Sequence, residues 1–195
     1  MALFARWRAE RDLRRRSLGY VASLLEEPSD ADARWLAEVA TRGDVDHARW
    51  ELRYARRAVG LIVAQRDALD DRTGSSVGRA LADAFERDPN IATDRLAVAR
   101  HQFNARLGAY RDVLTSRPPA ARTAAPREAG AQTQTRLGRN LLAFAGGPVR
   151  ADAAEVARAG EIVLAYIDAA HEALRNAFGA ASLPEDVTPS ALLRT

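Results

Sequence analysis

The stretch that decides the fold is residues 44–69, DVDHARWELRYARRAVGLIVAQRDAL. Its apolar residues recur at steps of three, four and seven positions, a spacing that places side chains on one face of an α-helix. These positions are Ala48, Leu52, Ala55, Val59, Ile62 and Leu69. Residues 58–64 are apolar on nearly every face, and a helix of that kind is buried. The sequence therefore predicts a helix at the centre of an α-helical bundle.

Five further stretches have helical patterning, with turn residues between them. We expect long or short helices over residues 3–27, 30–41, 91–116, 136–144 and 151–178. The last of these keeps a 4-3-4-3 seam of coiled-coil type. Its seam positions are Val156, Gly160, Val163, Ile167, Ala170, Leu174 and Ala177. No window alternates apolar and polar residues as a strand would, so we predict an all-α protein, an elongated bundle of five or six helices.

Capping residues define the start of the central helix. Pro28-Ser29-Asp30 ends the first helix and offers an N-cap for the second. Gly43 closes that second helix, and Asp44 is a suitable N-cap for the central one. These residue types predict two turns early in the chain.

The far end of the central helix can be read in two ways. We favour a continuous helix, kinked at Gly74 and Gly78, that reaches Asp88 and is roughly 65 Å long. The alternative is a break at residues 73–76 that divides it in two. In either case a turn at Asp88-Pro89-Asn90 makes the helix over 91–116 antiparallel to it, which gives a long central αα-hairpin.

The second half of the chain contains an expected linker. Residues 117–135 include three prolines and no large apolar side chain, so we expect this segment to be flexible. The predicted organisation is a helical bundle over 1–116, this linker, a helical segment over 136–181 that packs on the bundle or on a partner subunit, and a tail over 182–195.

Composition excludes several classes of protein. The 195 residues include no cysteine, which excludes disulfides, Cys-ligated metals and a cysteine nucleophile. All 29 basic residues are arginine, and 26 acidic residues leave a net charge of +3. The longest apolar run, residues 58–64, is far shorter than the ~20 residues of a membrane span. We expect no transmembrane segment, no secretory signal and a cytoplasmic protein.

The basic start of the chain is the main candidate for partner binding. Arg14, Arg15 and Arg16 follow Trp7 and Arg11, and guanidinium groups bind carboxylates and phosphates and stack on aromatic rings. Residues 151–195 carry 7 acidic side chains against 3 arginines. We therefore expect these arginines to pair with the last helix, within the chain or in a dimer. The tail offers a second candidate segment for docking, which contains Leu192 and Leu193.

A polar segment after the central helix has a weaker functional interpretation. If the central helix breaks, Ser75 and Ser76 with Arg72 and Arg79 form an anion site at a new helix start; otherwise this segment simply lies in water.

Two acid–histidine pairs, Asp44 with His47 and Asp168 with His171, have the spacing of metal ligands. Capping explains Asp44, and a half-buried core position explains His171. We therefore predict no metal and no cofactor. Three scattered histidines also define no catalytic triad, so we predict no enzymatic activity.

These observations predict a non-enzymatic protein that works by protein–protein association, as a homo-oligomer or as part of a larger assembly. The alternative is a helical protein that binds nucleic acid through its basic first helix. A second alternative is a bundle that binds a metal or small ligand near Asp168, His171 and residues 67–71.

Overall fold

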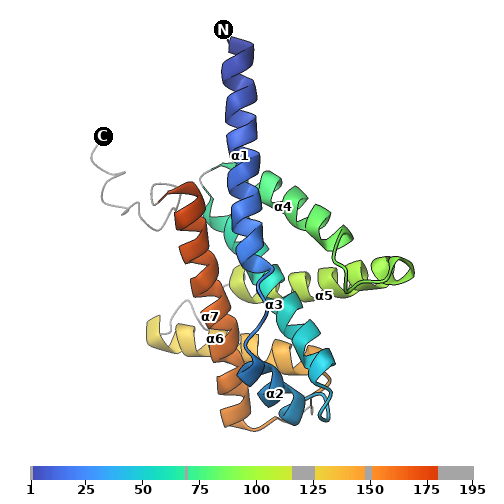
Figure 1. Cartoon of the computed structure of the whole chain (residues 1–195). Helices are drawn as coiled ribbons and strands as arrows, with labels where there is room; N and C mark the ends of the chain where they lie inside the picture. Colours follow the sequence, from blue (N-terminus) through green and yellow to red (C-terminus); the bar gives the residue numbers. More distant parts are fainter. Residues whose placement is uncertain (1, 69, 116–125, 148–150, 180–195) are drawn as a thin grey trace. The chain divides into compact units, whose positions relative to one another are not determined.

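The structure, a computed structural model, describes residues 2–68, 70–115, 126–147 and 151–179 (Figure 1). The helices are α1 (Ala2–Leu24), α2 (Asp30–Val39), α3 (Val45–Asp67), α4 (Asp71–Glu86), α5 (Leu96–Thr115), α6 (Pro126–Phe144) and α7 (Ala153–Phe178). A 3₁₀ turn, η1 (Thr93–Arg95), precedes α5. The described residues contain no strand, and the prediction of an all-α bundle is confirmed.

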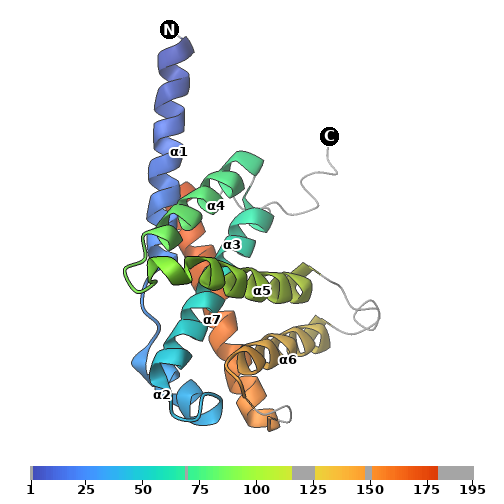
Figure 2. The same cartoon turned by 90° about the vertical axis from the view of Figure 1, so that its right-hand side faces the viewer.

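The helices form two compact units, each made of separate stretches of the chain. Unit 1 comprises Met1–Glu26, Gly60–Leu96 and Ala169–Thr195, and unit 2 comprises Glu27–Val59 and Ala97–Asp168. Helices α3 and α7 therefore contribute residues to both units. Figure 2 shows the same helices from a second direction.

Both early turns form as the capping residues predict. Ser29 is the N-cap of α2, and its Oγ accepts a hydrogen bond from the backbone N–H of Asp32 at 3.1 Å. The Oδ1 of Asp44 accepts from the backbone N–H of His47 at 2.9 Å, in the first turn of α3. Gly43 has a φ of +88°, the left-handed conformation that closes a helix without the steric cost of a side chain.

The prediction of a continuous, kinked helix from 44 to 88 is wrong. Helix α3 ends at Asp67 and α4 begins at Asp71, so the break lies before residues 73–76. Asp70 is the N-cap of α4, and its Oδ1 accepts from the backbone N–H of Thr73 at 2.6 Å. A carboxylate that caps the following helix competes with continuation of the preceding one, and here the cap prevails. Gly74 lies inside α4 and does not interrupt that helix.

In unit 2, the first part of α3 packs antiparallel to α5. Glu51 contacts Arg106, and Tyr54 contacts Phe103 with ring centroids 6.4 Å apart, so rising numbers on α3 meet falling numbers on α5. The expected core positions Ala48, Leu52, Ala55 and Val59 are all fully buried. The antiparallel pair is therefore present, but α4 lies between its two helices in sequence, and α5 begins at Leu96 rather than at residue 91.

Helices α6 and α7 of unit 2 cross closely at two glycines. A Cβ atom added to Gly138 on α6 would overlap the carbonyl oxygen of Val156, and one added to Gly160 on α7 would overlap that of Gln134. Helix α6 begins at Pro126, so residues 126–135, which the sequence assigns to a flexible linker, are helical. Residues 116–125 of the expected linker lie outside the described residues.

In unit 1, the second half of α1 packs on α3 and α4. The Tyr20 hydroxyl donates a hydrogen bond to the carbonyl oxygen of Gly60 at 2.7 Å, and the side chain of Leu24 lies directly over Gly60, where a Cβ would collide with it. On the α4 side, Ser17 and Ser76 are hydrogen-bonded through their hydroxyls at 2.8 Å. These contacts orient α1 within unit 1.

Candidate interaction surface

Helix α1 has one packed side and one exposed side. Ser17, Tyr20, Val21 and Leu24 are 0–2% exposed and face the core of unit 1. The large apolar side chains on the other side are open to solvent: Phe4 is 71% exposed, Trp7 58% and Leu18 48%. Among the described residues only one other large apolar side chain, Val98 on α5, is comparably exposed.

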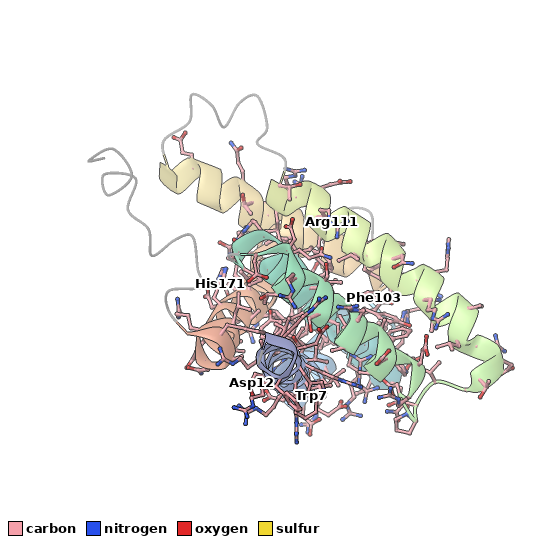
Figure 3. All side chains as sticks on the ribbon, turned by 90° about the horizontal axis from the view of Figure 1, so that it is seen from above. Trp7, Asp12, Phe103, Arg111 and His171 are labelled. Carbon is pink, nitrogen blue, oxygen red and sulfur yellow. The ribbon has the colours of Figure 1, made fainter. Side chains whose placement is uncertain are left out.

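The first half of α1 runs beyond the other helices of unit 1. Figures 1 and 2 both show it extending past the nearest ends of α4 and α7. In Figure 3, where α1 is seen end-on, side chains that include Trp7 and Asp12 spread outward around it. Trp7 borders a hollow of about 530 Å³ lined by Arg6, Trp7, Glu10, Arg11 and Arg14. This half of α1 is therefore accessible to a partner.

We call the exposed side of α1 the cationic face. At 3.6 residues per turn its members fall within an arc of roughly 120° and extend over roughly 21 Å of helix. They are Phe4, Trp7, Arg8, Arg11, Arg14, Arg15 and Leu18. All are exposed, and the arc contains no acidic residue. Glu10 and Asp12 flank it on either side.

Contacts within the cationic face are local. The guanidinium carbon of Arg11 lies 5.5 Å from the ring centroid of Trp7, within cation–π range. Arg15 pairs with Asp12 of the same helix at 3.2 Å, and both side chains are more than half exposed. Such exposed pairs contribute little stability. The charge of this face is therefore largely available to a partner.

The sequence spacing places Phe4, Trp7, Leu18 and Val21 on one stripe of α1, but of these only Val21 is buried. The neighbouring helices end before the first half of α1, which leaves Phe4 and Trp7 uncovered. Among the described ion pairs, none joins Arg14, Arg15 or Arg16 to α7 of the same chain.

A groove beside the cationic face separates α1 from the end of α7 in unit 1. Its volume is about 400 Å³. It is lined by Arg15, Arg16, Gly19, Ser23, Ala173, Asn176 and Ala177. Arg16, which belongs to the predicted partner-binding set, is thus exposed at this groove. Leu192 and Leu193, the other predicted docking residues, lie outside the described residues.

A buried acid–histidine pair lies at the C-terminal end of α3 in unit 1. The Oδ2 of Asp67 lies 2.9 Å from Nε2 of His171 on α7, and both oxygens of Asp67 accept from Arg66. Burial by itself raises the pKa of Asp67, but the hydrogen bonds from His171 and Arg66 outweigh it and hold that pKa below its usual value. Burial and the nearby Asp67 raise the pKa of the Tyr20 hydroxyl well above its usual range.

The other sequence-predicted site residues are not assembled into a site. Ser75 and Ser76 lie inside α4 rather than at its start, so the premise of the predicted anion site is wrong, although Arg72 and Arg79 are exposed on that helix.

The two metal-type pairs make other contacts. Asp44 accepts a hydrogen bond from the backbone N–H of His47 in the first turn of α3. His171 turns to Asp67, while Asp168 is exposed. Within the ranges that the structure describes, no three His, Cys, Asp or Glu side chains are grouped as a metal would require.

Sequence reasoning missed one buried ion pair. In unit 2 the guanidinium of Arg106 binds the carboxylate of Glu51 and lies over the rings of Tyr54 and Phe144, 5.3 Å and 4.6 Å from their centroids. Arg106 lies three residues after Phe103 and four before Tyr110, so it occupies a position in the apolar stripe of α5. A charged residue at that spacing is the signal that was available.

No known protein family, curated protein or solved structure matches this chain. Among the described residues, no helix has an apolar stretch of the length that crossing a bilayer requires.

Proposed function

We propose that this protein is a non-enzymatic association module, and that the cationic face of α1 docks on an acidic helical surface of a protein. The observation that carries the proposal is the exposure of Phe4, Trp7 and Leu18 among four arginines on α1, whose first half extends past the other helices of unit 1. Exposed apolar side chains of this size, gathered on one face, mark interaction sites more often than isolated ones do.

The composition of the face favours a protein partner. Trp and Arg are the residue types enriched at the energetic centres of protein interfaces. Arginine forks bind carboxylates in two places at once, and the apolar side chains need an apolar counterpart such as the alkyl surface of a helix. Leu18 offers nothing to a phosphate backbone, and Glu10 and Asp12 beside the face would repel one.

Nucleic acid is the second candidate, favoured by one specific contact. The stacked pair of Arg11 and Trp7 resembles the combination of aromatic platform and positive charge that binds single strands. The first 16 residues carry 6 arginines and 2 acids, a local charge of +4. Binding of this kind weakens steeply as salt concentration rises, which provides its test.

Photo-crosslinking from the cationic face tests the proposed function. A benzoylphenylalanine placed at position 7 in the host cell is expected to form a discrete adduct with protein. The adduct is expected to disappear when Arg11 and Arg14 are both replaced by Glu. The matched control carries the same photoreactive residue in place of the exposed Val98 on α5.

The outcomes separate the candidates. A protein adduct at position 7 that is absent at position 98 and depends on the arginines supports docking through the cationic face. Adducts that a nuclease removes favour nucleic acid instead. No adduct above the level seen at position 98 overturns both.

A further inference from the structure

We infer that the surface bound by the cationic face is the acidic outer face of α7 on a second copy of this chain. This inference rests on the proposed function and names its partner.

Helix α7 has an outer face of three carboxylates and one alanine. Glu161, Ala165, Asp168 and Glu172 are all exposed and follow one another at steps of four, three and four, so they form one stripe along the helix. Among the described ion pairs, Glu161 contacts Arg158 of its own helix at 3.8 Å, and its side chain is 58% exposed. Arg158 and Arg175 lie at the two ends of this stripe, three residues before Glu161 and three after Glu172, and the acids lie between them.

The charged residues of the two faces have the same spacing. Arg8 and Arg15 are seven residues apart on α1, and Glu161 and Asp168 are seven residues apart on α7. Seven residues make two helical turns, roughly 10.5 Å. Two helices laid side by side can therefore pair both arginines with both acids at once. The small side chain of Ala165 between the acids leaves room for larger side chains of the cationic face.

Charge complementarity favours pairing of α1 with α7 of a second copy over pairing of two α1 helices. Two α1 helices side by side would bring arginines together, and like charges across an interface cost several kcal/mol. An α1 helix on an α7 helix brings opposite charges together instead. The acids of α7 pair with none of the cationic-face arginines of their own chain among the described residues, so both faces are open.

A charge-swap experiment on the full chain tests this inference. One variant carries Arg8→Glu and Arg15→Glu, and the other carries Glu161→Arg and Asp168→Arg. Sedimentation equilibrium is expected to show that the wild-type protein self-associates and that each variant alone does so more than about tenfold more weakly. Mixing the two variants is expected to restore association, because each variant then supplies the charge that the other has lost.

The matched control is Arg72→Glu with Arg79→Glu, which reverses two exposed arginines at the same seven-residue spacing on α4. It is expected to leave self-association unchanged. Circular dichroism of every variant checks that it is folded.

Three results would overturn the inference: a wild-type protein that stays monomeric, a mixture that does not re-associate, or a control that weakens association as much as the α1 variant. If this inference fails, the crosslinking experiment still tests the proposed function separately. An arginine-dependent adduct at position 7 with a different protein keeps α1 as a docking helix and excludes only the second copy.

Discussion

The guanidinium of Arg106 binds both carboxylate oxygens of Glu51, with Nη2 2.5 Å from Oε1 and Nε 2.9 Å from Oε2. The two side chains are 11% and 4% exposed and join α5 to α3 in unit 2. Taking two charges out of water is costly, and the two-point geometry, together with the hydrogen bond from Nη1 to the Gln102 carbonyl oxygen, offsets much of that cost. We therefore expect the pair to contribute more to the specificity of packing than to net stability.

Replacing Arg106 by Met is expected to lower the free energy of unfolding by about 3–5 kcal/mol, because it leaves the Glu51 carboxylate buried without its main partner. The double variant Glu51→Met, Arg106→Met removes both charges and is expected to recover most of that loss. Urea denaturation of the two single variants and the double variant measures the coupling. A single variant that costs less than about 1 kcal/mol would contradict this account of a buried pair.

Asp67 is expected to make stability depend on acid. Its pKa in the folded protein is lower than in the unfolded chain, so the unfolded state binds the proton more readily. The stabilisation is therefore complete above the unfolded pKa of about 3.9 and is lost as pH falls through the lower folded pKa. Asp67→Asn is expected to cost about 1–3 kcal/mol at neutral pH, through the weaker bonds to Arg66 and His171, and progressively less below about pH 4.

The control for this prediction is Asp71→Asn, which changes an exposed carboxylate at the start of α4. Denaturant midpoints of both variants, measured from about pH 7 to about pH 2, separate the buried carboxylate from a general effect of charge. A constant difference between wild type and Asp67→Asn across that range would show that Asp67 does not titrate differently in the two states.

The N-cap of α4 is expected to be worth about 1 kcal/mol, the usual cost of replacing a capping Asp by Ala. In Asp70→Ala the backbone N–H of Thr73 loses its carboxylate acceptor. Thermal unfolding measures the loss, and Asp71→Ala, which removes the next carboxylate without removing the cap, is expected to cost only a few tenths of a kcal/mol. Equal losses for the two variants would mean that charge at the helix start matters and the cap does not.

Local signals account for the parts of the fold that could be predicted. The ends of α2 and the start of α3 depend on Ser29, Gly43 and Asp44, whose effects act within a few residues. The contact of Asp67 with His171 joins residues 104 positions apart, and no local pattern contains it. The close approach of α6 and α7 at Gly138 and Gly160 is likewise a contact between separate helices.

The candidate surface was only half predictable for a related reason. Sequence identified Trp7 and the arginines as a distinctive segment, since residue type alone indicates binding chemistry. The same three-and-four spacing, however, describes a buried seam and an exposed stripe equally well. Whether Phe4 and Trp7 are covered depends on where the neighbouring helices end, and a helix end is set by caps and contacts elsewhere in the chain.

The close crossing of α6 and α7 is expected to make Gly138 intolerant of any side chain. Gly138→Ala places a Cβ against the backbone of α7 at Val156, which cannot move aside as a flexible side chain would. We expect the variant to lose about 3 kcal/mol or more of stability in urea. Gly108→Ala is the matched control, because Gly108 lies in α5 with nothing within 4 Å of its Cβ position. That control is expected to gain about 0.5–1 kcal/mol from higher helix propensity. If Gly138→Ala is as stable as Gly108→Ala, α6 and α7 do not approach each other this closely.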